Sequence, residues 1–183
     1  IMGIPNVGKS TIINILAGRI IAKTGNEPAV TKHQQKINLG NNLILSDTPG
    51  VLWPNLENRN SGYRLAVSGA IKDTAFQYDD IALFALEYLL KAYPALLQKR
   101  YQIELLPDEP MALLEAIGRK RGCLKAGKQV DYDKAAKLVL NELRTGTLGA
   151  ITLETPAMIA DEMVELEAIR AAKAEKKAAR RRR

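Results

Sequence analysis

The sequence predicts an α/β fold of the phosphate-loop nucleotide-binding type, followed by a small all-α domain. The first observation is Gly3-Ile4-Pro5-Asn6-Val7-Gly8-Lys9-Ser10, which fits G-x-x-x-x-G-K-[ST] and leads directly into an apolar helical pattern. The second is Asp47-Thr48-Pro49-Gly50, which follows a strand-like run further along the chain. The third is that only helical patterns follow Arg64, because no β-branched run longer than a few residues occurs beyond Ile44.

The first motif predicts a loop that wraps around a polyphosphate. Its glycines let the backbone curl so that successive N–H groups point inward, and the following helix adds the positive end of its dipole. In such a loop Lys9 reaches the outer phosphates and the Ser10 hydroxyl binds Mg²⁺. The predicted nucleotide-binding residues are Asn6, Val7, Gly8, Lys9, Ser10, Thr11 and Gly50. A glycine-rich turn that only caps a helix would leave the second motif unexplained.

Periodicity and chain breakers define the elements of the N-terminal part. We expect a helix from Lys9 to Ala17 that ends at Gly18, and an irregular segment over 19–33. Two short strands, Gln35–Leu39 and Leu43–Ser46, are expected to form an antiparallel hairpin. The second motif then leads into a loop that contains Trp53-Pro54 and the polar run 55–61.

Dense apolar positions separated by Gly and Pro predict a helical set after Arg64. Asp79 or Asp80 is the expected N-cap of one helix, and Asp131 is the expected N-cap of another. The expected helices are Leu65–Lys72, Ile81–Ala92, Pro94–Tyr101, Met111–Arg121, Tyr132–Arg144 and a C-terminal helix over 157–183. We therefore divide the chain into a nucleotide-binding part, 1–75, a helical domain, 76–156, and a helical basic tail, 157–183.

Charge and cysteine content restrict the class of protein. The formal net charge of +7 belongs to the tail, because residues 170–183 hold eight basic side chains and one acid. The single cysteine, Cys123, rules out an internal disulfide and suits a reducing, cytosolic setting. No apolar run is long enough to span a membrane, and no secretory signal opens the chain. The first residue is not Met and no strand precedes the loop, so we expect the natural chain to begin further upstream.

The second motif predicts a switch that responds to the bound nucleotide. Asp47 would hold Mg²⁺ through water, and the Gly50 N–H would sense the γ-phosphate. A threonine between the two motifs would complete the metal shell with Ser10 and Asp47. Thr31 is our choice for this residue and Thr24 is the alternative. Loss of the γ-phosphate would release both segments.

Two signals that such switches often carry are missing. Val51 stands where many of them place a Gln that orients water, so the sequence identifies no catalytic residue. The guanine-reading pattern N-K-x-D is also absent, and no further parallel strand follows Asp47 to carry one. Either this half of the domain is lacking or it lies upstream in a circularly permuted order, which the helical domain directly after the switch favours.

Five segments of the chain resemble one family. They are Gly3–Thr11, Lys23-Thr24-Gly25, Pro28-Ala29-Val30-Thr31, Asp47–Pro54 and Gly69-Ala70-Ile71-Lys72-Asp73, and the similarity continues through 121–124 and 131–136. They resemble ribosome biogenesis GTPase A, a family of bacterial, circularly permuted GTPases with a small helical C-terminal domain. The resemblance implies a guanine-reading motif before the phosphate loop and an aliphatic residue at the position of Val51. Ala29 departs from the family, which usually has Gly there.

Three single residues have two interpretations each. Asn6 occupies the position at which potassium-activated GTPases hold a K⁺ ion beside the β–γ bridge, and it is alternatively a loop former bonded to its own backbone. His33 is close enough to Thr31 to face the attacking water, but an exposed loop histidine is the preferred interpretation. Cys123 has basic neighbours, which favour a reactive thiolate, and it fits equally well as a small buried residue, so we assign it no role.

Two basic clusters indicate a polyanionic partner. One lies around the turn between Gly118 and Gly127, and the other is the tail from Arg170. The residues of the first cluster are Arg119, Lys120, Arg121, Lys125 and Lys128. Such clusters bind phosphate backbones without sequence preference, although a solvated charged face is the commoner explanation of a single run. Aromatic residues are absent from both clusters, so contact with RNA shape and phosphate is expected rather than base stacking.

These observations lead to one preferred function and two alternatives. The preferred function is a cytoplasmic, Mg²⁺-dependent factor that binds and hydrolyses GTP during assembly of the large ribosomal subunit, activated by the ribosomal particle and docked on ribosomal RNA. The first alternative is a potassium-dependent GTPase in another RNA-processing task. The second is an RNA-binding switch with little hydrolysis, which Val51 favours. No membrane partner and no oligomer are predicted.

Overall fold

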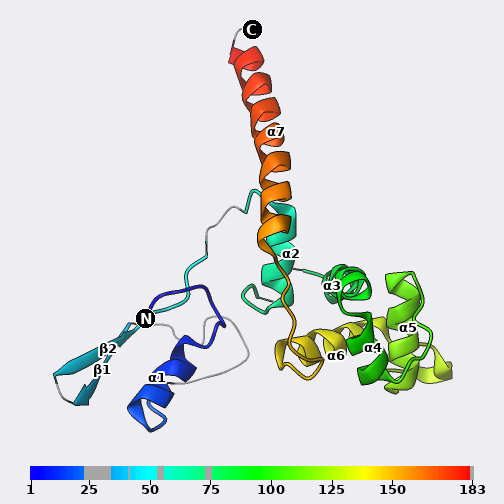
Figure 1. Ribbon diagram of the computed structural model, residues 1–183, viewed down its shortest axis with the longest axis horizontal. Helices are drawn as coiled ribbons and strands as arrows, with labels where there is room; N and C mark the ends of the chain where they lie inside the picture. The colour runs from blue at the N-terminus through cyan, green and yellow to red at the C-terminus, as the bar shows by residue number, and fades with distance from the viewer. Residues whose placement is uncertain (23–33, 41, 53–55, 73–75, 182–183) are drawn as a thin grey trace.

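The computed structural model describes residues 1–22, 34–40, 42–52, 56–72 and 76–181. Within these ranges a helix and a hairpin come first, a set of packed helices follows, and a long helix comes last (Figure 1). This order agrees with the expected α/β part followed by an all-α domain. The expected loop around Thr31 and the Trp53-Pro54 pair lie outside the described residues.

The N-terminal unit consists of helix α1, Lys9–Ala17, and the antiparallel strands β1, Gln35–Gly40, and β2, Leu43–Asp47. Ile13 of α1 and Ile37 of β1 are buried together in a small core. Gly18 ends α1 with a φ of 64°, a conformation that glycine adopts without steric cost. The first helix and the hairpin are therefore confirmed, with each strand one residue longer than expected.

Five α-helices and one 3-10 turn in the described ranges form the larger, helical part. They are α2, Arg59–Val67; α3, Tyr78–Ala92; α4, Pro94–Tyr101; α5, Pro110–Lys120; η2, Ala126–Lys128; and α6, Tyr132–Arg144. Helix α3 lies at the centre, because α2, α4, α5 and α6 all pack against it. Leu86 and Leu89 of α3 are buried with Leu113 and Ile117 of α5 and Val139 of α6.

Two helices begin earlier than the sequence suggested. Helix α2 runs from Arg59 to Val67, so the expectation of a helix over Leu65–Lys72 was wrong at both ends. The polar run 55–61, which was expected to be a loop, contains the N-cap of α2. Asn58 Oδ1 accepts hydrogen bonds from the backbone N–H groups of Asn60 (2.8 Å) and Ser61 (3.3 Å). Helix α3 begins at Tyr78, so Asp79 and Asp80 lie in its first turn and not at its N-cap. In the first turn their negative charges still interact favourably with the positive end of the helix dipole.

The other helix boundaries agree closely with the sequence. Pro94 and Pro110 stand in the first turn of α4 and α5, where the missing N–H costs nothing. Helix α5 ends at Lys120, one residue before the expected Arg121. Asp131 is confirmed as the N-cap of α6, because its Oδ1 accepts a hydrogen bond from the Lys134 N–H at 3.2 Å.

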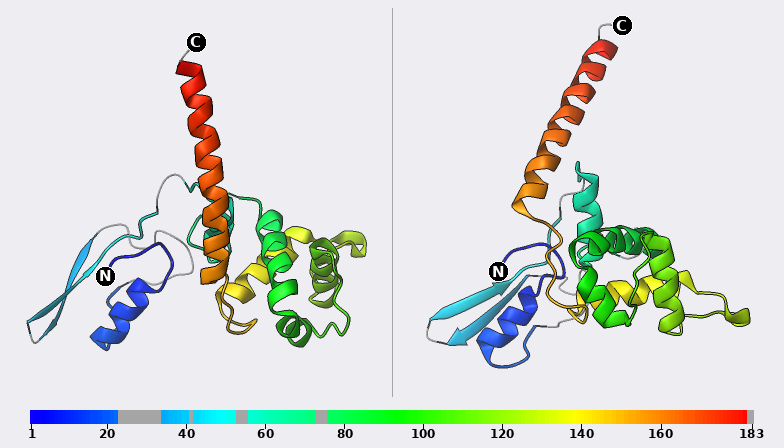
Figure 2. Two further views of the ribbon diagram at one scale, coloured as in Figure 1. Left: turned by 45° about the horizontal axis from the view of Figure 1, so that its top comes forward. Right: turned by 45° about the vertical axis from the view of Figure 1, so that its right-hand side comes forward.

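The last helix, α7, runs from Pro156 to Arg181, and its later part extends away from the rest of the protein (Figures 1 and 2). Helix α2 shares buried residues with α3 and α6, so it packs with the helical part. The division at 75 and 76 stays a prediction. Among the described residues, no helix combines the length and apolar character that crossing a bilayer requires.

Candidate nucleotide-binding site

The phosphate loop joins the N-terminal residues to α1. Two of its residues have positive φ, Asn6 at 56° and Gly8 at 81°, and Gly8 is the residue that immediately precedes the helix. The first intrahelical hydrogen bond runs from the Ile12 N–H to the Gly8 oxygen at 2.9 Å. The backbone N–H groups of the first helical turn therefore face the loop, as a phosphate-binding helix end requires.

Lys9 folds back over the loop that it is predicted to serve. Its Nζ donates a hydrogen bond to the Ile4 oxygen at 2.7 Å, and the side chain is buried. This carbonyl belongs to the loop itself, so the ammonium group lies beside the space that the motif encloses. A phosphate oxygen offers it a stronger, charge-assisted acceptor in place of that carbonyl.

Ser10 and Asp47 meet across α1 and β2. Ser10 Oγ donates a hydrogen bond to Asp47 Oδ2 at 3.1 Å, and Asp47 is almost fully buried as the last residue of its strand. A hydroxyl and a carboxylate are the hard oxygen ligands that Mg²⁺ prefers. The described residues contain no group of three or more His, Cys, Asp or Glu that could enclose a metal ion.

Gly50 packs directly against the phosphate loop. A Cβ atom built on Gly50 would lie 2.4 Å from Pro5 Cα and 2.5 Å from Pro5 N, so no larger residue fits there. The next backbone N–H, that of Val51, donates a hydrogen bond to the Gly3 oxygen at 3.2 Å. Thr48 Oγ1 also bonds the Ile1 oxygen at 2.6 Å. The second motif is therefore fixed to the first by close backbone contacts.

The remaining predicted site residues lie in different environments. Val7, in the loop, and Thr11, in the first turn of α1, are exposed. Val51 is 70% exposed, so its aliphatic side chain faces solvent at the position where a water-orienting Gln was sought. Asn6 Nδ2 donates a hydrogen bond to the Gly69 oxygen at 3.4 Å. Thr31, its alternative Thr24 and also His33 lie outside the described residues, so their roles stay predictions.

The first basic cluster is partly neutralised within the helical part. Arg119 is paired with Glu115 (2.7 Å), and Lys120 Nζ donates to the Gln102 oxygen (3.1 Å). Lys125 lies 3.9 Å from Asp131, and Lys128 is exposed on the η2 turn. The proposed RNA contact by these residues stays a prediction.

Arg121 contacts a buried carboxylate at the surface of the helical part. It lies 3.3 Å from the buried carboxylate of Glu142, which Arg100 also contacts, and its guanidinium stacks over the Tyr101 ring. Burial is the largest single effect and raises the pKa of Glu142, but hydrogen bonding and the positive charges of Arg100 and Arg121 together outweigh it, so the net pKa lies below its usual value. Arg121 thus completes the pairing of a buried acid.

Cys123 is a buried thiol. It lies in the core of the helical part with leucines of α3 and α5, and burial raises its pKa. A raised pKa disfavours the reactive thiolate that basic neighbours would otherwise promote. The buried interpretation of Cys123 is therefore the one that the structure supports.

Sequence reasoning missed two junctions, one that connects this site to the helices and one that joins two helices. Gly69 contacts both Asn6 and Arg144, and Glu162 of α7 binds Arg64 of α2. Gly69 carried a local signal, because a glycine just after an apolar helical run is the usual helix stop. No local sequence signal pointed to Arg64, Arg144 or Glu162, because an isolated charged residue on a helix resembles any solvent-exposed position.

The sequence matches a family model and several curated proteins. The model described as "50S ribosome-binding GTPase" matches residues 1–112. "Ribosome biogenesis GTPase A" of Priestia megaterium is 52% identical over 157 residues, which cover 86% of this chain and 54% of that protein. The protein of the same name from Bacillus cereus is 49% identical over 169 residues, which cover 92% of this chain and 57% of that protein. The chain spans about half the length of the curated relatives it matches.

Solved structures show the same arrangement of elements. The GDP-bound structure of TM YlqF matches with a TM-score of 0.56 and 27% identity, over 84% of this chain and 58% of that one. GNP-bound YlqF from T. maritima matches with a TM-score of 0.54 and 27% identity, over 84% of this chain and 57% of that one. The family model covers more than half of the chain and includes the phosphate loop, the Ser10–Asp47 contact and the Gly50 packing. The chain belongs to the 50S ribosome-binding GTPase family.

Proposed function

We propose that this chain is the phosphate-binding and switch portion of a factor that binds and hydrolyses GTP during assembly of the large ribosomal subunit. The observation that carries the proposal is the Ser10–Asp47 contact at 3.1 Å, because it joins the two motifs that must share one metal ion. The family description and the names of the relatives supply the ribosomal context. A factor with this task acts where ribosomal subunits are assembled, so we expect a cytoplasmic location.

The site residues divide the work of binding a triphosphate. The loop N–H groups and Lys9 hold the phosphate oxygens, while Ser10 and Asp47 hold Mg²⁺ with help from Thr31. The ion, when bound, neutralises charge that develops between the β- and γ-phosphates. The Gly50 N–H senses the γ-phosphate, and its contact with Pro5 passes a change in this segment to the loop.

Two further parts of the proposal concern charge. Asn6 is a candidate ligand for K⁺ beside the β–γ bridge, where a cation would replace the charge of an arginine finger. A K⁺ role predicts faster GTP turnover in potassium than in sodium, and equal turnover in both would overturn it.

The helical part and the basic tail dock on ribosomal RNA, with exposed Lys128 as a phosphate contact.

A second candidate function is an RNA-binding switch with negligible hydrolysis. It is favoured by Val51, whose 70% exposed aliphatic side chain can neither orient nor deprotonate water. In this candidate the nucleotide controls RNA affinity, and turnover is incidental. The two functions differ in whether the partner supplies catalytic help.

The deciding experiment measures GTP turnover by the full-length protein in potassium buffer, with and without purified large ribosomal subunits. We expect strong stimulation by the subunits, because the catalytic group is then supplied in the complex. Slow turnover that the subunits do not change would overturn activated hydrolysis. RNA affinity that depends on the nucleotide under the same conditions would establish the switch instead.

A further inference from the structure

The turn after α2 contacts the phosphate loop and the helical part at a single glycine. Gly69 has a φ of 77°, and a Cβ atom built on it would lie 2.9 Å from Asn6 Nδ2 and 3.2 Å from Arg144 Nε. The loop side chain and the helical side chain therefore press on the same backbone unit. A residue with a side chain would displace one of them, so the position requires glycine.

On the loop side, the Gly69 carbonyl is a hydrogen-bond partner of the Asn6 amide. Asn6 Nδ2 donates to the Gly69 oxygen at 3.4 Å. Because the NH₂ end of the amide is directed to Gly69, its carbonyl oxygen is directed elsewhere. Asn6 lies between Gly3 and Gly8, within the loop that encloses the phosphates. A shift of the Gly69 carbonyl would therefore change the geometry of the loop.

On the helical side, Arg144 fixes the end of α2. Its Nε donates to the Val67 oxygen at 2.9 Å and its Nη2 to the Ala66 oxygen at 2.8 Å. These carbonyls are in the last turn of α2, where a cation is favoured by the helix dipole. The Ala66 oxygen also accepts from the Gly69 N–H at 3.0 Å, so Arg144 and Gly69 share an acceptor.

Arg144 is itself fixed by the core of the helical part. It is the last residue of α6, whose Val139 and Leu140 are buried. The buried face of α6 packs against α3, and a rotation of α6 would move the guanidinium and the turn together. The chain of contacts thus runs from the core through Arg144 and Gly69 to Asn6.

We propose that Arg144 is a positioning residue that acts through Gly69 on Asn6 and thereby couples nucleotide binding to the packing of the helical part. This inference rests on the proposed function, because it assumes that the phosphate loop binds nucleotide. Coupling between two sites is reciprocal, so a nucleotide that orders the loop must also stabilise the turn and α6. Any partner that shifts α6 would, by the same link, change nucleotide affinity.

The test compares GDP binding by the full-length protein and its Arg144 variants. We expect Arg144→Ala to weaken GDP affinity about tenfold, within the usual range of coupling between sites. Arg144→Lys should lose less, because one ammonium group can still reach one of the two carbonyls. Arg59→Ala is the matched control, since Arg59 is exposed at the opposite end of α2, and its affinity should equal the wild-type value.

A second measurement keeps the inference testable if Arg144→Ala does not fold. In the wild-type protein, GDP should slow hydrogen exchange of the Gly69 and Ala70 amides, which bond the Ala66 and Leu65 oxygens. If GDP binds to the wild-type protein but leaves the exchange of these amides unchanged, the coupling is overturned and the proposed function stays intact. Equal GDP affinity in a folded Arg144 variant would overturn the coupling in the same way. Failure of the wild-type protein to bind GDP would overturn the proposed function and the coupling with it.

Discussion

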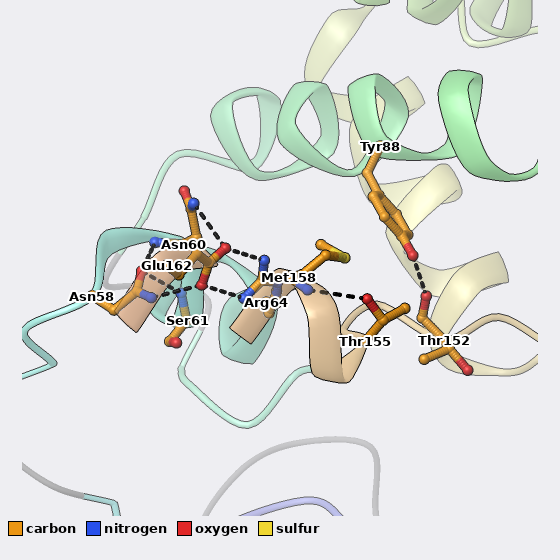
Figure 3. A network of polar contacts seen from close by, with 9 residues as sticks. All are labelled: Asn58, Asn60, Ser61, Arg64, Tyr88, Thr152, Thr155, Met158 and Glu162. Carbon is orange, nitrogen blue, oxygen red and sulfur yellow. Dashed lines mark hydrogen bonds and ion pairs between the residues drawn. The ribbon is translucent and has the colours of Figure 1, made fainter. Parts of the chain in front are cut away.

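Arg64 of α2 donates a bidentate pair of hydrogen bonds to Glu162 of α7, and both side chains are largely buried. The Asn58 and Asn60 amides donate to the same carboxylate, at 2.6 Å and 3.1 Å (Figure 3). Asn58 is also the N-cap of α2, so one side chain starts that helix and binds the C-terminal helix. The start of α2, which follows the Gly50 segment in sequence, is thereby joined to the base of α7.

A second contact joins α7 to the residue just before the N-cap of α2, and it is weaker. Arg170 Nε donates to Glu57 Oε2 at 2.8 Å, but both side chains are more than half exposed. Exposed ion pairs contribute about 0–1 kcal/mol, whereas a largely buried charged pair costs more when one partner is removed. Glu162, rather than Arg170, is therefore the residue that holds α7 to α2.

The first prediction concerns Glu162 and pH. The hydrogen bond from Arg64 is the largest effect on the pKa of Glu162, and together with the bonds from Asn60 and Asn58 it lowers this pKa to about 2 against the opposing effect of burial. Because the folded pKa lies below the ordinary 4.5, the pair stabilises the fold above about pH 4.5 and loses this contribution as the pH falls toward 2. Glu162→Gln should lower the free energy of unfolding at pH 7 by about 2 kcal/mol.

Chemical denaturation at a series of pH values measures this effect. The difference in stability between wild type and Glu162→Gln should be constant above pH 5 and shrink below about pH 4.5. Glu87→Gln is the control, because Glu87 forms an exposed i,i+4 pair with Lys91 and its loss should change little. A difference that does not depend on pH would show that the Glu162 charge contributes nothing.

The second prediction separates one arginine and one lysine, Arg121 and Lys128, that the sequence grouped in the same basic cluster. Arg121→Gln removes one partner of the buried Glu142 and should lower the melting temperature by about 2–4 °C, the shift expected for about 1 kcal/mol in a chain of this size. Lys128→Gln should leave the melting temperature unchanged, because Lys128 is exposed on the η2 turn.

RNA binding should show the opposite order. Lys128→Gln should weaken binding to ribosomal RNA and reduce the magnitude of the salt slope by about 1, as loss of one phosphate contact does. Arg121→Gln, measured below its melting temperature, should have the smaller effect. If Arg121→Gln weakens RNA binding more while its stability is unchanged, the assignment of Arg121 to the Glu142 pair is wrong.

Sequence patterns predicted the elements that local chemistry determines. Gly18 marks the end of α1, Asp131 caps α6, and the hairpin follows from its turn residues, because each signal lies within a few residues of its effect. The start of α2 was missed because Asn58 was read as part of a polar loop. Its capping role is visible only once Arg59 is known to be helical.

The candidate site was predictable as a motif but not as a set of contacts. The pattern identified Lys9, Ser10 and Asp47 because the chemistry of phosphate and Mg²⁺ restricts which residue types can serve. The links to the helices depend on pairs that are far apart in sequence, such as Asn6 with Gly69 and Arg64 with Glu162. No local pattern specifies such a pair, since each partner alone resembles an ordinary surface residue.

The third prediction concerns the shared metal site. Ser10→Ala and Asp47→Asn each remove an oxygen ligand or its charge from the 3.1 Å contact. GTP affinity of the full-length protein should fall at least tenfold in Mg²⁺ buffer for either variant, and should match the wild-type value in EDTA. Titration with a fluorescent GTP analogue measures both conditions. An equal loss in EDTA would show that these side chains support the loop and not the ion.

The fourth prediction concerns the contact between Gly50 and the phosphate loop. Gly50→Ala places a Cβ atom 2.4 Å from Pro5 Cα, a backbone atom that cannot move without deforming the loop. We expect GTP and GDP affinity to fall by more than tenfold, a larger effect than loss of a single neutral hydrogen bond. Gly62→Ala is the control, because a Cβ atom there meets only Leu56 Cδ1 at 3.7 Å and replaces glycine within α2.

The two glycine variants should therefore affect different quantities. Gly62→Ala should raise the free energy of unfolding by about 0.5–1 kcal/mol, because alanine favours the helix, and should leave nucleotide affinity unchanged. Isothermal titration with GDP and a thermal melt of each variant measure both quantities. If Gly50→Ala binds GDP as wild type does, the Gly50 segment and the loop are separated when nucleotide is bound, and the route by which a γ-phosphate signal reaches Pro5 does not exist.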